Sequence, residues 1–399
     1  MENIIYLDHA ATTKIDDVVL KEMLPYLSYN YGNASSLYSI GKTSKQAIDR
    51  ARVQVANAIG CSAEEIYFTS CGSESDNLAI KGIADANKRY GKHIITSNIE
   101  HPAVLETCKS LERAGYEVSY VPVMENGIID VKALSKLIRR DTILISIMTA
   151  NNEVGTIQPI EQIGKIARMN NIMFHTDSVQ AVGNIKIDVR KMNIDALSMS
   201  GHKFYAPKGI GALYVRNGVK FTRQQDGGHQ EKEKRAGTEN VASIVGLGKA
   251  IEIANANLEQ YNNHLIKLRD LYAKSILRLF SNIHVNGDVT NRLSGNMNIS
   301  FIGYKGADIV EQLDKRGICT SSGSACSAGL PMHSSVLMNM THNVKIAEGS
   351  LRVTFGKENT VEDVERLVYA LSDILGKRWW LNNEFYKWKI PLVWYQGLP

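Results

Sequence analysis

The sequence has no long apolar run, and it is poor in proline and cysteine for its 399 residues. Its longest apolar runs, such as residues 142–148, have the length of a strand and fall well short of the ~20 residues that a membrane-spanning helix needs. We therefore expect no membrane segment. The first residues carry neither the basic region nor the apolar core of a secretion signal, and the five cysteines are an odd number. Both features favour a cytoplasmic protein over a disulfide-stabilised secreted one.

The sequence also lacks a surplus of charge of one sign. There are 46 basic and 41 acidic residues, which leaves a net charge of +5. A nucleic-acid-binding protein typically carries a larger, clustered basic surplus, so we expect no direct nucleic-acid partner, while an acidic protein partner stays open. Glycine (31 residues) far outnumbers proline (8), and 44% of the residues are apolar. This composition argues against collagen-like and disordered classes and is typical of a globular protein.

Strand-like and helix-like segments alternate through the first two-thirds of the chain. This alternation is typical of parallel βαβ units in an α/β fold. Residues 249–281 then show apolar residues at helical spacing, which predicts one long helix leaving the first domain. The other predicted elements of the first domain are strands 66–69, 93–97, 118–123, 142–149, 172–177, 196–200 and 210–216 and helices 131–139 and 160–168.

We place a domain boundary near residue 260. Residues 15–260 then form a large α/β domain, whereas residues 1–14 and 261–399 form a smaller α+β domain. The elements predicted in the small domain are strands 296–301 and 350–355 and helices 307–316 and 361–375.

Two candidate catalytic side chains follow predicted strands. Lys203 lies in SGHKFYAPKGIG between two strand-like runs, where a lysine is either an imine-forming nucleophile or a solvated charge. Asp177 ends the strand of FHTDSVQ and is followed by Gln180, at the strand end where open α/β sheets bind ligands. A helix N-cap is the alternative interpretation of Asp177.

A turn and a histidine upstream add to this set. The segment FTSCGSESDN leads from a strand into a helix near Glu74, and its small residues let a phosphate approach backbone N–H groups, although a plain strand-to-helix turn has the same pattern. His101 follows the strand ending at Ser97 and is either a catalytic ring or a satisfied structural residue. An imine-forming lysine, an acid for a pyridine nitrogen, a phosphate-sized turn and a ring that can stack together meet the needs of pyridoxal phosphate.

Ten segments of the chain resemble, in order and spacing, the motifs of the cysteine desulfurases, which are pyridoxal-phosphate enzymes with the class V aminotransferase fold. They extend from Tyr6 to about Leu375. The segments are YLDHAATT, GNASS, FTSCGSESDN, EHPAV, NNEVGTIQPI, HTDSVQAVG, SGHKFYAPKGIGALYVR, RAGTENV, SSGSACSAG and SLRVTFG.

The resemblance implies a fold type I enzyme whose large domain has a mainly parallel seven-stranded sheet. It implies that the protein removes sulfur from L-cysteine, releases L-alanine and holds the sulfur as a persulfide on one of its own cysteines. A homodimer is also implied, together with sulfur delivery to an iron–sulfur scaffold protein or another acceptor, tRNA thiolation being a further destination.

The resemblance also assigns roles to residues at the matching motif positions. Lys203 is the Schiff-base lysine and a base, Asp177 is the partner of the pyridine nitrogen, and His101 stacks on the ring and assists proton transfer. Arg352 pairs with the substrate carboxylate. The resemblance implies phosphate contacts from Gly72, Ser73, Ser200, His202 and Thr238, of which Thr238 comes from the other subunit. It implies that Asn152 and Gln180 contact the ring hydroxyl and that Asn152 also contacts the substrate.

Cys326 lies in SSGSACSAG, a stretch of small residues that predicts a mobile loop. The resemblance makes Cys326 the persulfide carrier, because a thiolate has to reach the substrate sulfur and then swing outward to an acceptor. It is also a candidate transient ligand of a cluster. The alternative is a small buried apolar side chain. The other cysteines are interpreted as structural, and none of the pairs has zinc-type spacing, so we expect no resident metal.

The sequence departs from the family pattern at Ser73, Cys71 and Ala34, where the family commonly has Thr, Gly and Pro. Ser73 keeps the hydroxyl group, and Cys71 either lies close to the cofactor phosphate or is passive. All four tryptophans follow residue 378, in a tail that either docks a sulfur acceptor or packs on the small domain. Three alternative functions stay open: a selenocysteine lyase, an aminotransferase of the same fold, or an inactive sulfur-carrier or scaffold homologue.

Overall fold

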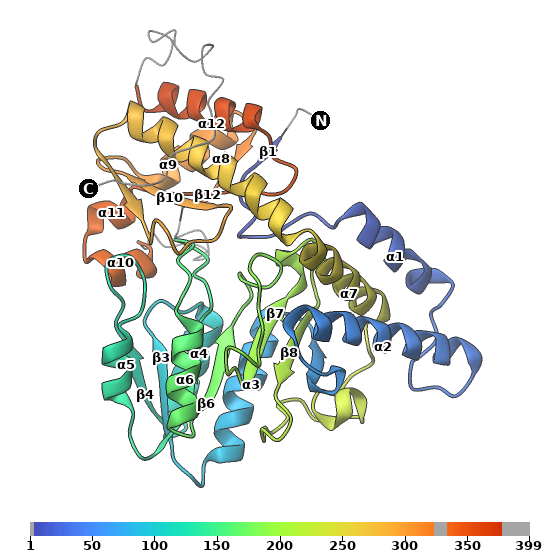
Figure 1. Cartoon of the computed structure of the whole chain (residues 1–399). Coiled ribbons are helices and arrows are strands. Elements are labelled where there is room, and N and C mark those ends of the chain that lie inside the picture. The colour runs from blue at the N-terminus through green and yellow to red at the C-terminus, as the bar shows by residue number, and fades with distance from the viewer. Residues whose placement is uncertain (1–3, 323–332, 377–399) are drawn as a thin grey trace.

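The computed structural model describes residues 4–322 and 333–376 and contains a large three-layer lobe with a smaller lobe above it (Figure 1). The strands of the large lobe are β2 (Ile66–Thr69), β3 (His93–Ser97), β4 (Glu117–Val121), β5 (Thr142–Ser146), β6 (Met173–Asp177), β7 (Ala196–Ser200) and β8 (Gly211–Val215). Its helices are α1 (Asp17–Ser28), α2 (Ser39–Ile59), α3 (Gly72–Asn87), α4 (Pro102–Arg113), α5 (Val131–Leu137), α6 (Ile160–Met169) and α7 (Val241–Ala256).

The seven strands form one sheet in the order β2-β8-β7-β6-β5-β3-β4. Only β8 runs antiparallel to its neighbours β2 and β7. The strands β7, β6, β5, β3 and β4 pair in parallel. This confirms the predicted mainly parallel seven-stranded sheet, and it places the carboxyl ends of β6 and β7 side by side. Ligands of open α/β sheets bind at such ends.

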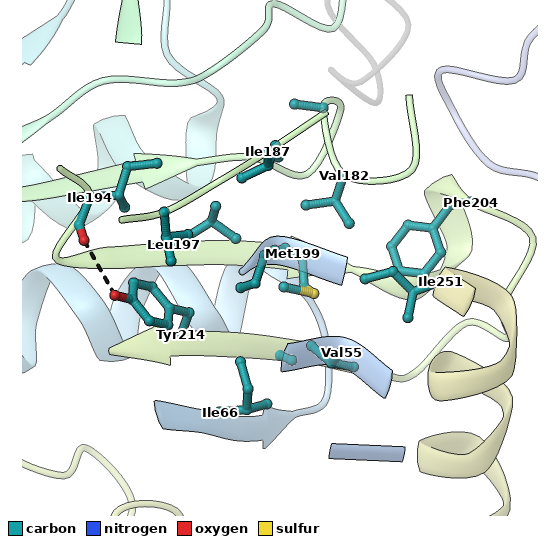
Figure 2. Packing of buried hydrophobic residues seen from close by; sticks show 14 of the residues in the cluster. Val55, Ile66, Val182, Ile187, Ile194, Leu197, Met199, Phe204, Tyr214 and Ile251 are labelled. Atoms are coloured by element: carbon teal, nitrogen blue, oxygen red, sulfur yellow. Dashed lines mark hydrogen bonds between the residues drawn. The ribbon is translucent and has the colours of Figure 1, made fainter. Parts of the chain in front are cut away.

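Alternate residues of each strand enter two separate apolar cores, because successive side chains on a strand point to opposite faces. Ile94 of β3 packs with α3 and α4 on one face, whereas Ile95 packs with α2, α5, α6 and α7 on the other. Figure 2 shows part of the second core, in which Val55 of α2 lies near β8 and Ile251 of α7 lies beside Phe204. Full burial of each such aliphatic side chain stabilises the fold by ~1.5–3 kcal/mol.

The small lobe has its own core around a three-stranded antiparallel sheet in the order β12-β10-β9, and a short parallel pair joins β1 to β11. Its strands are β1 (Ile5–Tyr6), β9 (Ile283–Asn286), β10 (Asn296–Phe301), β11 (Ile318–Cys319) and β12 (Ser350–Thr354). Its helices are α8 (Leu258–Leu279), α9 (Gly306–Asp314) and α12 (Val361–Ile374), and the short helices α10 (Ser335–Thr341) and α11 (Val344–Glu348) precede β12. The domain division near residue 260 stays a proposal, and the membership of Ile5 and Leu7 in the core of the small lobe is compatible with it.

The single helix predicted for residues 249–281 is wrong, because the structure has two helices there. α7 begins at Val241 and ends at Ala256, and α8 begins at Leu258. Asn257, at φ −109° and ψ 12°, separates them, and its side-chain amide donates a hydrogen bond to the Ile253 carbonyl. Apolar residues continue at helical spacing through the break, since α7 packs on the large core and α8 on the small one.

Two predicted features lie outside the described residues. These are the loop around Cys326 and the tail with the four tryptophans. None of the helices described is long and apolar enough to cross a membrane.

Candidate active site

Lys203 lies in a single 3-10 turn (Gly201–Lys203) that follows β7 directly. The turn is tight because Gly201 has no side chain: a Cβ there would lie 3.0 Å from Ala206, Ile210 and Leu247. The Lys203 Nζ donates hydrogen bonds of 2.7 Å to the carbonyl oxygens of Ala10 and Ala11. The lysine is thereby held at the carboxyl end of the sheet, at a half-buried position.

Several predicted site residues contact the N-terminal segment from Ala10 to Thr13. The Gln180 side-chain amide donates to the Ala10 carbonyl at 2.9 Å, so this one oxygen contacts both Gln180 and Lys203. His202 Nδ1 lies 3.0 Å from the Thr12 hydroxyl. Burial, followed by the positive charge of Lys203, lowers the pKa of His202 to about 4, so its imidazole is neutral. A neutral ring can still donate to a phosphate from one nitrogen.

Asp177 ends β6 and is 6% exposed. Its Oδ1 accepts a hydrogen bond from the Val179 N–H at 2.9 Å, which caps the turn that follows the strand. Asp177 therefore caps a turn and not a helix, which was the alternative interpretation of this residue. Burial raises the pKa of Asp177, and the nearby charges of His101 and Lys203 lower it. The three groups interact electrostatically and so belong to one site.

His101 is the N-cap of α4, and its Nδ1 accepts a hydrogen bond of 3.1 Å from the Ala103 N–H. In the neutral ring the proton is therefore on Nε2. Burial and the charge of Lys203 lower the pKa of His101, whereas the Asp177 carboxylate raises it. His101 is thus both a structural cap and a member of the charged site, so the two interpretations of this residue are compatible.

The turn before α3 has the shape that an anion site needs. A Cβ added to Gly72 would lie 2.6 Å from Val179 Cγ2 and 3.4 Å from Ser200 Cβ, so the predicted residues Gly72 and Ser200 lie together beside the Asp177 turn. α3 has 16 residues, and the first N–H groups of a helix have no acceptor within the helix and lie at the positive end of its dipole. These features fit a phosphate group. The Ser73 side chain, next along α3, is exposed.

Thr238 is exposed, and within this chain the structure does not bring it to the other predicted residues through any described contact. Its segment is tied to α3 by the ion pair between Arg235 and Glu74 at 2.8 Å. Cys71, the N-cap residue of α3, is half-buried and free of disulfide bonding.

Arg352 of β12 lies at the junction of the two lobes. Its guanidinium donates to the Asn152 carbonyl at 3.0 Å and forms an ion pair with Asp8 at 2.8 Å. The Arg352 Nε is buried and has no hydrogen-bond partner in the described part of the chain. An unpaired buried donor is costly, and an acceptor brought to it would remove this cost.

The structure does not describe Cys326, but it describes both flanks of its segment. The Ser321 N–H and carbonyl pair with the backbone of Arg352, at 3.1 and 2.6 Å. The Ser334 hydroxyl donates to the Glu153 carboxylate, next to Asn152. Burial raises the pKa of Glu153 to about 7. The segment that contains Cys326 therefore starts and ends beside the residues predicted to bind the substrate.

Sequence reasoning does not single out Asp8 or the Ala10 and Ala11 carbonyls as parts of the site. All lie in the motif YLDHAATT, where the small side chains of Ala10 and Ala11 leave their backbone oxygens open to close approach. Asp76 and Glu100 are also missed. Both are buried carboxyl groups that interact electrostatically with Asp177.

Comparisons with known proteins identify the family of the chain. A family model described as "Aminotransferase class-V" matches residues 5–367. The chain is 52% identical over 375 residues to a protein of Methanosarcina thermophila named cysteine desulfurase IscS, with 94% of this chain and 92% of that protein covered. A protein of the same name from Dictyoglomus turgidum is 46% identical, with 98% and 99% covered.

Solved structures show the same fold. One titled "NIFS-LIKE PROTEIN" is similar with a TM-score of 0.88 at 38% identity, over 94% of this chain and 99% of that one. Another, titled "SspA in complex with cysteine", has a TM-score of 0.78 at 37% identity, over 88% and 98%. These likenesses confirm the predicted fold class. The chain belongs to the class-V aminotransferase family and, within it, to the cysteine desulfurases.

Proposed function

We propose that this protein converts L-cysteine to L-alanine and carries the released sulfur as a persulfide on Cys326. In the overall reaction the carbon–sulfur bond of cysteine breaks, a sulfur–sulfur bond forms at the enzyme thiol, and a proton replaces sulfur on carbon. The observation that carries the proposal is the convergence of Lys203, Asp177 and His101 at one end of the sheet, beside the turn at Gly72.

The residues present fit pyridoxal phosphate, the cofactor that the family resemblance implies. Lys203 would hold it covalently, Asp177 would keep its ring nitrogen protonated, and His101 would stack on the ring. When bound, the cofactor supplies an electron sink for charge that develops on the substrate. The other contacts in this proposal are Gly72, Ser73, Ser200 and His202 at the phosphate and Gln180 and Asn152 at the ring hydroxyl.

Arg352 would orient the substrate through its carboxylate. Its planar guanidinium is suited to a bidentate interaction, and its buried Nε has no partner among the residues described. The ion pair with Asp8 keeps the guanidinium in place before substrate arrives. Lys203, whose Nζ is held by two carbonyl oxygens, can take up and return a proton at the same end of the sheet.

A homodimer is part of the proposal, and exposed apolar side chains support it. α1 and the connection that leads from it to α2 reach outward from the large lobe (Figure 1), and their surface is rich in exposed apolar groups. Leu37 is 87% exposed and Leu27 61%. The other members of this surface are Leu20, Leu24, Tyr29, Tyr31 and Tyr38. Exposed apolar side chains that gather along one segment favour an interface there. A second copy would cover it and bring its own Thr238 to the phosphate.

Sulfur delivery to an iron–sulfur scaffold protein or another acceptor completes the proposal, with tRNA thiolation as a further destination. The cytoplasmic location stays a prediction.

The test uses the full chain reconstituted with pyridoxal phosphate and incubated with L-cysteine and a reductant. We expect alanine and sulfide in equal amounts. Cys326→Ser should keep the visible absorbance band of the bound cofactor and lose sulfide release, whereas Lys203→Ala should lose the band. If the protein releases alanine from selenocysteine but not from cysteine, it is a selenocysteine lyase. If Cys326→Ser releases sulfide as the wild type does, the persulfide step is excluded. A protein that binds no cofactor would overturn the proposal.

A further inference from the structure

A layer of buried polar side chains lies between the sheet and α3, behind Asp177. On the face of the sheet that α3 covers, the strands β3, β5 and β7 each begin with an apolar side chain and carry a polar side chain within two residues of their carboxyl ends. Residues two positions apart on a strand share a face, so His175 and Asp177 of β6 both belong to this layer. The polar members from the neighbouring strands are Thr96, Ser146 and Ser198, each fully buried.

Asp76 of α3 projects into this layer and is 1% exposed. Its Oδ1 lies 3.7 Å from His175 Nε2 and has no hydrogen-bond partner among the described residues, while Ser198 hydrogen-bonds the carboxyl group. The imidazole of His175 is held from both sides, by Ser146 at 2.8 Å from Nδ1 and by Ser198 at 3.0 Å from Nε2. A carboxylate oxygen that is buried without a partner costs more than the carbonyl oxygen of a neutral carboxylic acid in the same place.

The buried carboxyl groups of this layer differ in how strongly their surroundings favour the charged form. Burial raises the pKa of Asp76, Glu100 and Asp177, that of Glu100 to about 8, and the negative charge of Asp177 raises the pKa of Asp76 further. Lys203 and His101 act in the opposite direction, and they act on Asp177. Burial lowers the pKa of His175 to about 3, so the imidazole is neutral and forms no ion pair with Asp76. Carboxyl groups this close together in a buried layer cannot all be ionised, and the positive charge of Lys203 favours the ionised form of Asp177.

We propose that Asp76 stays protonated and forms, with Ser198 and His175, a neutral hydrogen-bonded brace that keeps the negative charge of this layer on Asp177. In the brace the carboxylic acid of Asp76 donates to Ser198, Ser198 donates to His175 Nε2, and His175 Nδ1–H donates to Ser146. Asp76 is a positioning residue, since it acts on the cofactor through Asp177. The inference rests on the proposed function, because it needs a cofactor whose ring nitrogen faces Asp177.

The first experiment compares Asp76→Asn, Asp76→Ala and Asp177→Asn by titrating the apo-proteins with pyridoxal phosphate. Asparagine keeps a donor and is uncharged, so Asp76→Asn should retain wild-type affinity and the wild-type pH midpoint of the visible band. Asp76→Ala removes the donor, and we expect about tenfold weaker binding, equivalent to ~1.4 kcal/mol, with a shifted midpoint. Asp177→Asn removes the charge itself and should weaken binding more than either.

The second experiment needs no cofactor. The infrared spectrum of the wild-type apo-protein near neutral pH should contain a protonated carboxyl band that Asp76→Asn removes in part. If Asp76→Asn leaves this band unchanged, or if it weakens cofactor binding as strongly as Asp76→Ala, Asp76 is ionised and the inference is wrong. Wild-type affinity and midpoint in Asp76→Ala would equally refute the brace. A wild-type protein that binds no pyridoxal phosphate would instead overturn the proposed function, and with it the purpose of the brace, while the infrared comparison would still report the protonation of Asp76.

Discussion

The buried ion pair between Arg52 of α2 and Glu231 leads to the sharpest stability prediction. The two side chains are 9% and 3% exposed and form two parallel hydrogen bonds of 2.7 Å. Arg52 also donates to the Ile66 carbonyl, and Glu231 accepts from the Phe68 N–H, both at 2.8 Å. The pair therefore fastens the segment around Glu231 to α2 and β2 at once.

This anchoring stabilises an unfavourable backbone. Glu231, Lys232 and Glu233 have φ values of 44°, 58° and 65°, in the left-handed region, where each residue other than glycine costs ~1–2 kcal/mol. The segment leads to Thr238, which we propose to contact the cofactor phosphate in the other subunit. Loss of the pair should therefore both destabilise the fold and release this segment.

The test replaces Glu231 by Gln, which keeps the shape and removes the charge. Breaking a buried pair from one side costs ~3–5 kcal/mol, because the remaining charge has no partner. With ~2.1 cal/mol/K of unfolding entropy per residue, a chain of 399 residues gives a melting temperature lower by ~4–6 °C. Circular dichroism melting of the apo-protein at one fixed concentration measures this. Glu161→Gln, which breaks an exposed helical pair with Lys165, is the matched control and should shift melting by less than ~1 °C.

A double variant, Arg52→Met with Glu231→Gln, separates the pair from its surroundings. Because no unpaired charge remains, its melting temperature should lie above the value expected from adding the two single effects. The reasoning is refuted if Glu231→Gln melts within ~1 °C of the wild type, or if the two single effects simply add.

Three further predictions concern the site. Gly72→Ala places a methyl group 2.6 Å from Val179 Cγ2, which costs ~1–3 kcal/mol of overpacking. In a titration of the apo-protein this cost should weaken pyridoxal phosphate binding ~5–150-fold. Unchanged affinity would exclude a tight turn at Gly72. Arg352→Lys keeps the charge but loses the planar fork, so the KM for L-cysteine should rise about tenfold while the cofactor band stays as in the wild type. Burial raises the pKa of Glu100 from its ordinary 4.5 to about 8, so its contribution to stability is complete below about pH 4.5 and is lost as the pH rises through about 8. Glu100→Gln should flatten the fall in melting temperature across this range, and an equally steep fall in the variant would contradict the shift.

The alternation of strands and helices could be predicted from the sequence because it depends on local periodicity. The strands 93–97 and 196–200 were predicted with the bounds that the structure has. The positions of Lys203 and Asp177 after predicted strands followed from the same pattern. That these two strands are neighbours in the sheet was decided by the topology. The break at Asn257 could not be predicted, because the apolar spacing continues through it while the partner core changes.

The roles of Lys203, Asp177, His101 and Arg352 came from motifs, whose order along the chain is a property of the sequence alone. Tertiary structure decided which groups surround them. Asp8 meets Arg352 across 344 positions and Glu231 meets Arg52 across 179, and no local pattern specifies such pairs. Local periodicity selects helices and strands from residues a few positions apart, whereas a buried charge takes the partner that packing of distant elements brings within reach.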